Sequence, residues 1–206
     1  DAYAVGIPAA AVVTLDDNDV DPDLQLWLGD TVAGGAWRDE SGNGRDGALK
    51  PVGVSGPYAA AGVVGTALEF DGTNDAVVVP YFPLNATAFT ISMRFRNDPT
   101  ATSSAFRHLF NMGGYDLPHS LTIFRVESND RIRTLIHDAN ELPSNTALDV
   151  HNMYADSTWR HYTLTASTAN GLRVYIDGSL AASTGSWSGN FDPVAALWFG
   201  WRGEYS

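Results

Sequence analysis

The sequence FTISMRFR at residues 89–96 alternates apolar and polar residues without interruption. Successive side chains of a β-strand point to opposite faces of a sheet, so Phe89, Ile91, Met93 and Phe95 would face a core while the polar residues face solvent. A helix would need apolar residues spaced three and four apart instead. These eight residues therefore predict a half-buried strand.

A second alternating run, Leu-Arg-Val-Tyr-Ile at residues 172–176, leads directly into Asp177-Gly178. An Asp-Gly pair suits the positive φ angles of a type I′ turn, so we expect a hairpin with a return strand at residues 179–183. Weaker strand patterns occur at residues 67–70, 76–81, 108–112, 120–126, 132–137, 159–165 and 196–201, with a turn at Asn129-Asp130. No long stretch has helical spacing. The sequence thus predicts an all-β fold of two packed antiparallel sheets.

Composition excludes several classes of protein. The chain has 206 residues, enough for one β domain, and 44% hydrophobic residues, enough for a sizeable core. Its 24 acidic and 12 basic residues give a net charge of -12, which would repel nucleic-acid phosphates. Cysteine is absent, so no disulfide holds the fold. No apolar stretch approaches the roughly 18 residues of a membrane span, so we expect no membrane insertion.

The N-terminal residues differ from the rest. An alternating run at residues 10–15 ends in Val12-Val13-Thr14-Leu15, and an acidic cluster, Asp16-Asp17-Asn18-Asp19, follows at once. This pattern resembles the closing strand of a Calx-β domain. Pro22 marks a natural boundary, because proline lacks an amide donor. We therefore expect residues 1–21 to be the end of a preceding Calx-β-like module and its linker, and residues 22–206 to form the sandwich.

Six short motifs follow one another along the predicted sandwich. They are Leu26-Trp27-Leu28-Gly29-Asp30, Asp39-Glu40-Ser41-Gly42-Asn43-Gly44-Arg45-Asp46-Gly47, Gly65-Thr66-Ala67-Leu68-Glu69-Phe70-Asp71-Gly72-Thr73-Asn74-Asp75, Phe89-Thr90-Ile91-Ser92, Trp159-Arg160-His161-Tyr162 and Val174-Tyr175-Ile176-Asp177-Gly178. In this order they resemble the concanavalin A-like lectin/glucanase superfamily, in particular its laminin-G-like bacterial branch. The resemblance implies a jelly-roll sandwich of two antiparallel sheets.

The C-terminal residues depart from that family pattern. Members of this branch usually close with a final apolar strand that carries an acidic pair, whereas this sequence ends at Tyr205-Ser206. Three alternatives are open: the last strand is lacking, an insertion separates it from the domain, or Val12–Leu15 takes its place. An unfilled position would leave a sheet edge with unpaired backbone groups.

Two aspartate-rich loops are candidate calcium sites. Asp39, Asn43 and Asp46 cluster in a glycine-punctuated loop, and Asp71 and Asp75 flank Gly72-Thr73-Asn74. Oxygen ligands at short spacing on a sharply turning backbone are what Ca²⁺ requires. The alternative is a pair of tight turns in which Asp and Asn accept backbone amide hydrogen bonds. A third candidate is the N-terminal cluster of Asp16, Asp17 and Asp19, either as an interdomain calcium site or as a solvated linker.

Aromatic and polar loop residues are candidates for sugar binding, because sugar rings stack on aromatic faces while their hydroxyls form hydrogen bonds. Trp187 lies in a serine- and glycine-rich loop with little local core to join, so we expect it to be exposed, with packing at the sandwich edge as the alternative. Trp27, Trp159 and Trp198 lie in strand patterns and are expected in the core. Further loop candidates are Tyr115, Asp116, His119, Asp138, Asn140 and Asn145.

These features predict a calcium-dependent, non-catalytic module that is secreted or displayed at the cell surface. The glucanase relatives carry a paired-carboxylate strand of the form E-x-D-x-x-E, which is absent here. The expected ligand is a glycan or cell-surface molecule, bound by an adhesin-like module beside neighbouring domains of a large bacterial surface protein. The alternatives are a structural split-sandwich scaffold that projects another domain and an accessory module of a carbohydrate-active enzyme.

Overall fold

Strands are the regular elements of the described chain. The computed structural model describes residues 22–51, 56–84, 87–97, 107–113, 118–126, 130–137, 145–153, 157–189, 191 and 195–200. Within these ranges every regular element is a β-strand, and every strand pair is antiparallel. No described helix is long and apolar enough to cross a membrane. The predicted all-β fold is confirmed.

The strands form two main sheets and one small hairpin. The nine-stranded sheet has the order β1-β2-β3-β6-β15-β8-β9-β10-β11, with β1 Leu28–Ala33, β2 Ala36–Asp39, β3 Gly47–Lys50, β6 Ala76–Val79, β8 Arg107–Met112, β9 Ser120–Val126, β10 Arg131–His137, β11 Asn145–His151 and β15 Leu197–Phe199. The four-stranded sheet has the order β14-β13-β12-β7, with β7 Ala88–Arg96, β12 Trp159–Ser167, β13 Gly171–Ile176 and β14 Ser179–Ser183. The hairpin pairs β4 Tyr58–Ala61 with β5 Thr66–Glu69.

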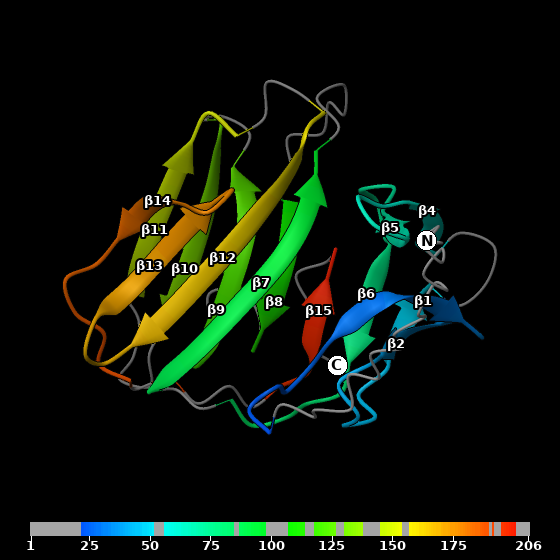
Figure 1. The fold of residues 1–206 in the computed structure, drawn as a ribbon, viewed down its shortest axis with the longest axis horizontal. Coiled ribbons are helices and arrows are strands. Elements are labelled where there is room, and N and C mark those ends of the chain that lie inside the picture. The colour runs from blue at the N-terminus through cyan, green and yellow to red at the C-terminus, as the bar shows by residue number, and fades with distance from the viewer. Residues whose placement is uncertain are drawn as a thin grey trace, which may run out of the picture.

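The two main sheets overlap over only part of the molecule. In Figure 1 the four-stranded sheet lies in front of β8, β9, β10 and β11, and the far edge is closed where β11 contacts β14. Strands β1, β2, β4, β5 and β6 lie beyond β7, outside this overlap. We call the two-layered part, β7 to β14, the closed half, and the part formed by β1 to β6 the open half.

Apolar side chains from both layers fill the closed half. The register pairs Ile91 of β7 with Leu164 of β12 on the inward face, and Leu164 is fully buried. Opposite them, β9 contributes Leu121 and Ile123, which are also fully buried. The apolar residues of β7 therefore face a second sheet, as the alternating sequence predicted.

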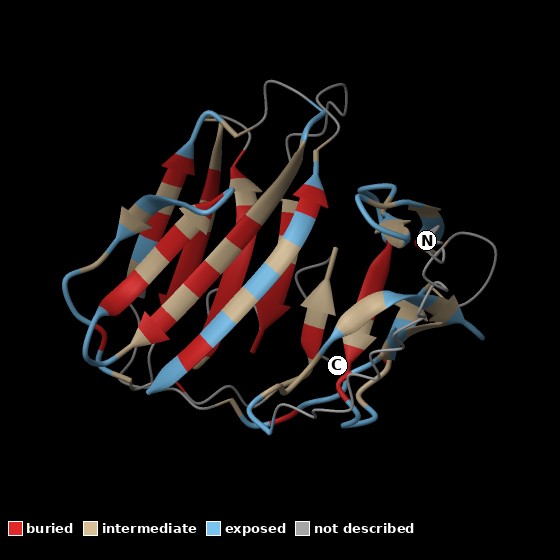
Figure 2. Ribbon diagram, viewed as in Figure 1, coloured by how far each residue is buried: buried red, intermediate tan, exposed pale blue. Residues whose placement is uncertain are grey.

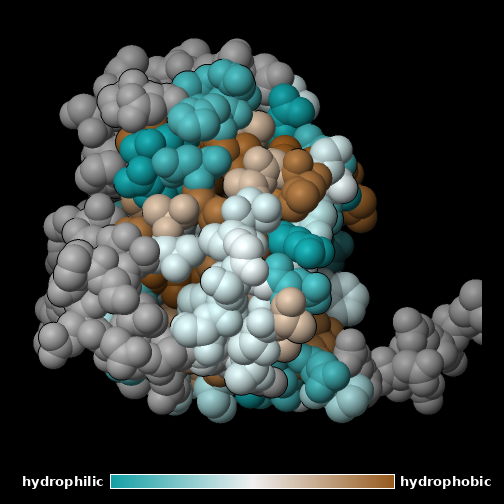
Figure 3. Space-filling view, turned by 90° about the vertical axis from the view of Figure 1, so that its left-hand side faces the viewer, coloured by the Kyte–Doolittle hydropathy of each residue, from teal (hydrophilic) through white to brown (hydrophobic). Residues whose placement is uncertain are grey.

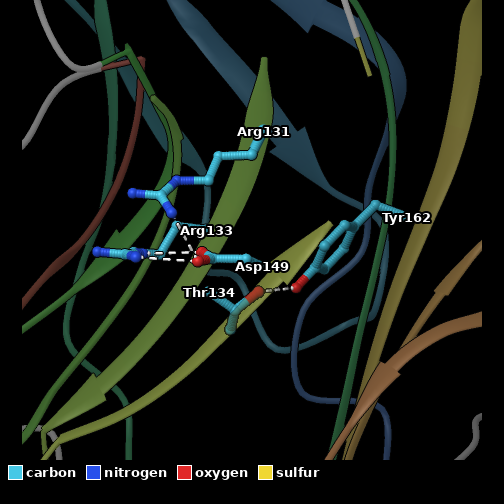
Figure 4. Close-up of polar contacts among 5 residues, drawn as sticks. All are labelled: Arg131, Arg133, Thr134, Asp149 and Tyr162. Atoms are coloured by element: carbon cyan, nitrogen blue, oxygen red, sulfur yellow. Dashed lines mark hydrogen bonds and ion pairs between the residues drawn. The ribbon is translucent and has the colours of Figure 1, made fainter. Parts of the chain in front are cut away.

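One polar link crosses between the layers. Tyr162 of β12 points its hydroxyl at the hydroxyl of Thr134 on β10, and both residues are buried (Figure 4). Burial raises the pKa of Tyr162 well above its ordinary value, so the hydroxyl stays protonated and able to donate. This hydrogen bond fixes the two sheets relative to each other at one point in an otherwise apolar core.

An ion-pair network lies on the outer face of the nine-stranded sheet, on β10 and β11. Arg133 donates to both carboxylate oxygens of Asp149, at 2.8 and 2.9 Å, and Arg131 donates to the same carboxylate at 2.8 Å (Figure 4). The hydrogen bonds from Arg133 hold the pKa of Asp149 below its ordinary value. The network links the last two strands of the sheet on the side away from the core.

The predicted hairpin is confirmed in detail. Asp177 and Gly178 have φ angles of 50° and 80°, as the type I′ turn requires, and strands β13 and β14 flank them. Positive φ at two successive residues matches the right-handed twist of the flanking strands. Sequence pattern alone thus located this turn and both of its strands.

Other strands were missed because their alternation is weak. Strands β1, β2, β3, β4 and β11 were not assigned from the sequence. The expectation that Asn145 lies in a loop is wrong, because it is the first residue of β11. The expectation that Trp27 is a core residue is also wrong, because 53% of its surface is exposed.

Candidate functional site

A cleft of about 2750 Å³ runs along β7. Within the four-stranded sheet β7 has a single neighbour, β12, so its other edge borders this cleft. The opposite wall consists of residues 23–30, residues 60–69 of the β4–β5 hairpin and the loop at residues 71–73. Pockets for small molecules measure about 300 to 1,000 Å³, so this cleft is large enough for an extended ligand.

The floor of the cleft is aromatic. Phe199 of β15 meets Trp37 of β2 edge to face at 6.0 Å between ring centroids, and it meets Phe110 of β8 at 5.8 Å. The indole N–H of Trp37 donates to the carbonyl oxygen of Gly29 at 2.8 Å, which fixes the ring. All four residues line the cleft. Edge-to-face packing makes the floor rigid and apolar.

Polar and aromatic side chains line the two rims. Trp27 and Glu40 lie on the side of β1, and Arg94, Trp159 and His161 lie on the side of β7. His161 Nε2 lies 2.7 Å from the hydroxyl of Ser92 across the β7–β12 pair. Exposed aromatic rings beside hydrogen-bonding groups are the combination that sugar-binding sites use.

The loop of residues 39–46 holds Trp27 at the cleft. One carboxylate oxygen of Asp39 accepts from the amides of Trp27 and Ser41, at 3.1 and 3.0 Å, and the other accepts from Arg45 at 2.8 Å. The Glu40 amide donates to the Trp27 carbonyl at 2.8 Å. Both backbone groups of Trp27 are therefore fixed by two consecutive residues of this loop.

The remaining polar groups of this loop are also engaged. Asp46 accepts from the Asp39 amide at 2.8 Å and pairs with Arg38, and these contacts lower the pKa of Asp46. Asn43 donates to the carbonyl oxygen of Leu24 at 2.8 Å. Burial tends to raise the pKa of Asp39, but hydrogen bonds from Ser41, Arg45 and Trp27 outweigh it and lower the pKa. The tight-turn alternative accounts for Asp39, Asn43 and Asp46.

The loop of residues 71–75 leaves one oxygen unused. Asp71 accepts from the amides of Thr73 and Asn74, at 2.7 and 3.3 Å. Asp75 is only 3% exposed, and its Oδ2 accepts from the Asp71 amide at 2.9 Å. Its Oδ1 is buried without a hydrogen-bond partner, and burial raises the pKa of this carboxyl. A buried carboxylate oxygen without a partner fits one ligand position of a cation.

The structure does not bring the two carboxylate loops together as one metal centre. Among the described residues, no group of three or more His, Cys, Asp or Glu side chains is arranged to hold a metal ion. The 39–46 loop uses its oxygens on backbone amides and Arg38, whereas the 71–75 loop retains the unpaired Oδ1 of Asp75. Any cation would therefore fit the second loop better than the first.

Trp187 does not lie where the sequence predicted. It is 6% exposed and belongs to the core cluster with Phe89 and Phe191, so the expectation of an exposed ring is wrong and the ring is packed in the core. Its serine- and glycine-rich loop gives no local sign of this, although Phe191, four residues further on, belongs to the same core. On the side of the molecule seen in Figure 3, hydrophobic groups appear in separate patches between hydrophilic and near-neutral residues.

The other predicted ligand residues do not gather at the cleft. His119 is half-buried, has a φ of 62° just before β9 and does not line the cleft, and Asn145 begins β11. The following predicted residues lie outside the described part of the chain: Asp16, Asp17, Asp19, Tyr115, Asp116, Asp138 and Asn140, together with the segment Val12–Leu15.

Sequence reasoning missed the residues that do line the cleft. Arg94 and His161 occupy polar positions of strands that the sequence identified, and Trp159 is half-buried beside them instead of lying in the core. Trp198 of β15 is likewise half-buried. The alternating pattern of residues 89–96 placed Arg94 on an exposed face, but nothing in it indicated that β7 borders a cleft.

The comparisons with known proteins agree on the fold. The model of the concanavalin A-like lectin/glucanases superfamily matches residues 71–204. No curated protein matches the sequence. The binding domain of Paraclostridial Mosquitocidal Protein 1 has a TM-score of 0.61 at 15% identity, over 84% of this chain and 43% of that structure.

Two botulinum neurotoxin structures are similar in the same way. The serotype D ligand binding domain in complex with N-acetylneuraminic acid has a TM-score of 0.60 at 12% identity, over 82% of this chain and 41% of that structure. The serotype C1 binding domain has a TM-score of 0.58 at 13% identity, over 78% of this chain and 39% of that structure. The chain spans less than half the length of these structures, and at these identities the similarity concerns the fold alone.

Proposed function

The chain belongs to the concanavalin A-like lectin/glucanases superfamily, and on that premise we propose that it is a non-catalytic module for glycan recognition or adhesion. The proposed binding site is the cleft along β7. The proposed setting is the outside of a cell, as part of a larger bacterial surface protein, because a glycan on a neighbouring surface is accessible only there. The similar structures are binding domains of toxins, which supports a binding role, and one of them was solved in complex with N-acetylneuraminic acid.

The observation that carries this proposal is the exposed ring of Trp27 at the rim of a large cleft with an aromatic floor. A tryptophan that is 53% exposed loses hydrophobic stabilisation unless a ligand covers it. The 39–46 loop holds the Trp27 backbone through its amide and its carbonyl, so the ring is positioned before any ligand arrives. Positioning in advance lowers the entropic cost of binding.

We further propose that calcium orders the loop of residues 71–75, which forms part of the opposite wall. The support is the buried Oδ1 of Asp75, which lacks a hydrogen-bond partner. The ion would neutralise the negative charge of this buried oxygen, and its coordination would fix the backbone around Gly72. Calcium dependence of ligand binding then follows from the position of this loop on the cleft wall.

A glycan array with the purified module tests the main proposal. We expect binding to at least one class of glycan in calcium, weaker binding in EGTA, and loss of binding in Trp27→Ala. Tyr81→Ala is the matched control, because Tyr81 is 48% exposed but does not line the cleft. Binding that survives Trp27→Ala, or an array without any signal in calcium, would contradict the proposal.

Among the described strands β7 pairs with β12 alone, and its other edge favours a second candidate function, the structural split-sandwich scaffold that projects another domain. An edge strand nine residues long with one paired neighbour presents backbone groups that another strand can pair with. The candidate occupant is the alternating segment that ends at Val12–Leu15, since the cleft wall begins at residue 23, only a few residues further along the chain.

Hydrogen exchange on two chains, with and without residues 1–20, tests this occupant of the β7 edge. We expect that deletion of residues 1–20 speeds amide exchange in β7 if this segment pairs with its free edge. Unchanged exchange in β7 would rule out this occupant and would leave the cleft open for a ligand. The amides of β9 serve as the internal control, because both neighbours of β9 are already in place.

A further inference from the structure

The outer face of the four-stranded sheet carries a group of basic and aromatic side chains. The register of β7, β12 and β13 places Arg96 beside Trp159, Arg94 beside His161, and Thr165 beside Arg173. In Figure 2 exposed residues of β7 alternate with buried or intermediate ones, in keeping with this outward face. We call this surface the arginine face and define it by Arg94, Arg96, Arg173, Trp159, His161 and Tyr175.

Among the described residues, the arginines of this face lack an acidic partner. Arg94, Arg96 and Arg173 form no ion pair with any carboxylate in the described part of the chain. Asp177 lies at the end of the face, but it already accepts from Arg160 at 3.1 Å and from the His161 amide at 2.8 Å. In a protein of net charge -12, three arginines on one sheet face without an ion-pair partner among the described residues create a local positive potential.

The side chains between the arginines suit a sugar. Arg96 lies over the ring of Trp159, with 5.3 Å from its guanidinium carbon to the ring centroid, so the two present a combined flat surface. Ser92, Thr163 and Thr165 add hydroxyl groups to the same face of the sheet. A guanidinium binds planar oxyanions through two parallel hydrogen bonds, and hydroxyl groups bond to sugar hydroxyls.

The spacing suits a polymer better than a single small anion. Alternate residues of a strand are roughly 6.6 Å apart, so Arg94 and Arg96 present two charges in a row along β7. We infer that the arginine face binds an anionic polysaccharide that carries sulfate or carboxylate groups. The inference rests on the proposed glycan-binding function and deepens it, since Arg94, Arg96, Trp159 and His161 also line the rim of the cleft.

Binding to immobilised polysaccharides tests the inference. Dextran sulfate and polygalacturonate present sulfate and carboxylate respectively, and neutral dextran controls for uncharged sugar. We expect the double variant Arg94→Gln/Arg96→Gln to bind the preferred polyanion about tenfold more weakly or worse than wild type. Lys50→Gln is the matched control, because it removes one exposed positive charge on β3, away from this face, and should bind as wild type.

The salt dependence of the affinity for the polyanion gives a second readout, which a misfolded variant would not reproduce. The logarithm of the affinity should fall linearly with the logarithm of salt concentration, and each arginine removed should reduce the slope by about one. Because Arg94 and Arg96 are exposed, the double variant should keep the wild-type melting temperature. Quenching of tryptophan fluorescence by the polyanion should disappear in Trp159→Phe.

The outcomes separate this inference from the proposed function. Wild type that binds neither polyanion, or a double variant that binds them as well as wild type, overturns the arginine face as the site. If neutral glycans still bind at the cleft in that case, the proposed function stands without it. Binding to vesicles that contain phosphatidylserine, together with no binding to either polysaccharide, would overturn the polysaccharide assignment and indicate a lipid surface instead.

Discussion

The closed and open halves of the molecule are built from the same kind of strand but are covered differently. Strand β9 of the closed half is buried at every residue except Arg125, whereas β1 and β4 of the open half contain no fully buried residue. In Figure 2 β9 is mostly red, whereas β1 and β4 are tan and blue; β6 is the buried strand of the open half. The difference arises because the four-stranded sheet ends at β7.

This contrast underlies the proposed division of roles, with stability assigned to the closed half and binding to the open half. Burial of apolar surface on both faces of the core gives the closed half its free energy of folding. The open half keeps aromatic groups at the surface, where a ligand can cover them. In the open half, the loop of residues 39–46 and the loop of residues 71–75 add polar contacts that hold the walls of the cleft.

The largest expected effect compares a leucine from each half. Leu164→Ala should lower the free energy of unfolding by about 2 to 5 kcal/mol, because Leu164 is fully buried and its removal leaves a cavity. Leu28→Ala should cost about 1 kcal/mol, since Leu28 is only partly buried against the core. Urea unfolding of both variants measures the difference. Equal losses would show that the two halves are packed alike.

The next effect concerns the polar link inside the closed half. Tyr162→Phe removes the hydroxyl that contacts Thr134 and leaves the buried Thr134 hydroxyl without this partner, at a cost of about 1 to 3 kcal/mol. The double variant Tyr162→Phe/Thr134→Val should recover part of that loss, because no buried hydroxyl then remains unpaired. A double variant as unstable as the sum of both single variants would argue against the link.

A smaller effect on stability, with a larger effect on binding, is expected in the open half. Asp39→Ala removes the acceptor for the amides of Trp27, Ser41 and Arg45 and should cost about 1 to 2 kcal/mol. Asp39→Asn retains one acceptor oxygen and should cost less. Glycan affinity should fall more in Asp39→Ala than in Asp39→Asn, in line with the mobility gained by Trp27. Titration calorimetry with an array-selected glycan measures this.

The smallest expected effects are changes in the free energy of unfolding with pH. They have opposite signs in the two halves. The pKa of Asp149 is lowered by Arg133, so its stabilising contribution is present above the unfolded pKa and is lost as pH falls below about 4. The pKa of Asp75 is raised by burial, so its contribution is present below the unfolded pKa and is lost as pH rises through the folded pKa.

Two asparagine variants separate these contributions. Asp149→Asn should flatten the loss of melting temperature in acid. Asp75→Asn should raise the melting temperature at neutral pH in EGTA, because a buried charge is removed, and should lower it in calcium if Asp75 is a ligand. A stabilising effect of Asp75→Asn in both conditions would contradict the calcium proposal, whereas unchanged acid behaviour of Asp149→Asn would contradict the role assigned to Arg133.

The sequence predicted the closed half better than the open half for a physical reason. Strands between a core and solvent alternate strictly, so β7 and the β13–β14 hairpin could be identified from their residues. Strands β1 to β4 lack a covering sheet, so selection for alternation is weak and they were missed. Trp187 was expected to be exposed and is buried, whereas Trp27 was expected in the core and is exposed. Burial depends on which other strands pack against a residue, and the local sequence does not show this.

Hydrogen exchange with and without an array-selected glycan tests the division into two halves most directly. The account predicts slow exchange in β9, β10, β12 and β13 in both states, with faster exchange in β1, β2 and the 71–75 loop that slows when the glycan binds. Uniform protection of both halves in the free protein, or a glycan footprint confined to β9 and β10, would contradict it.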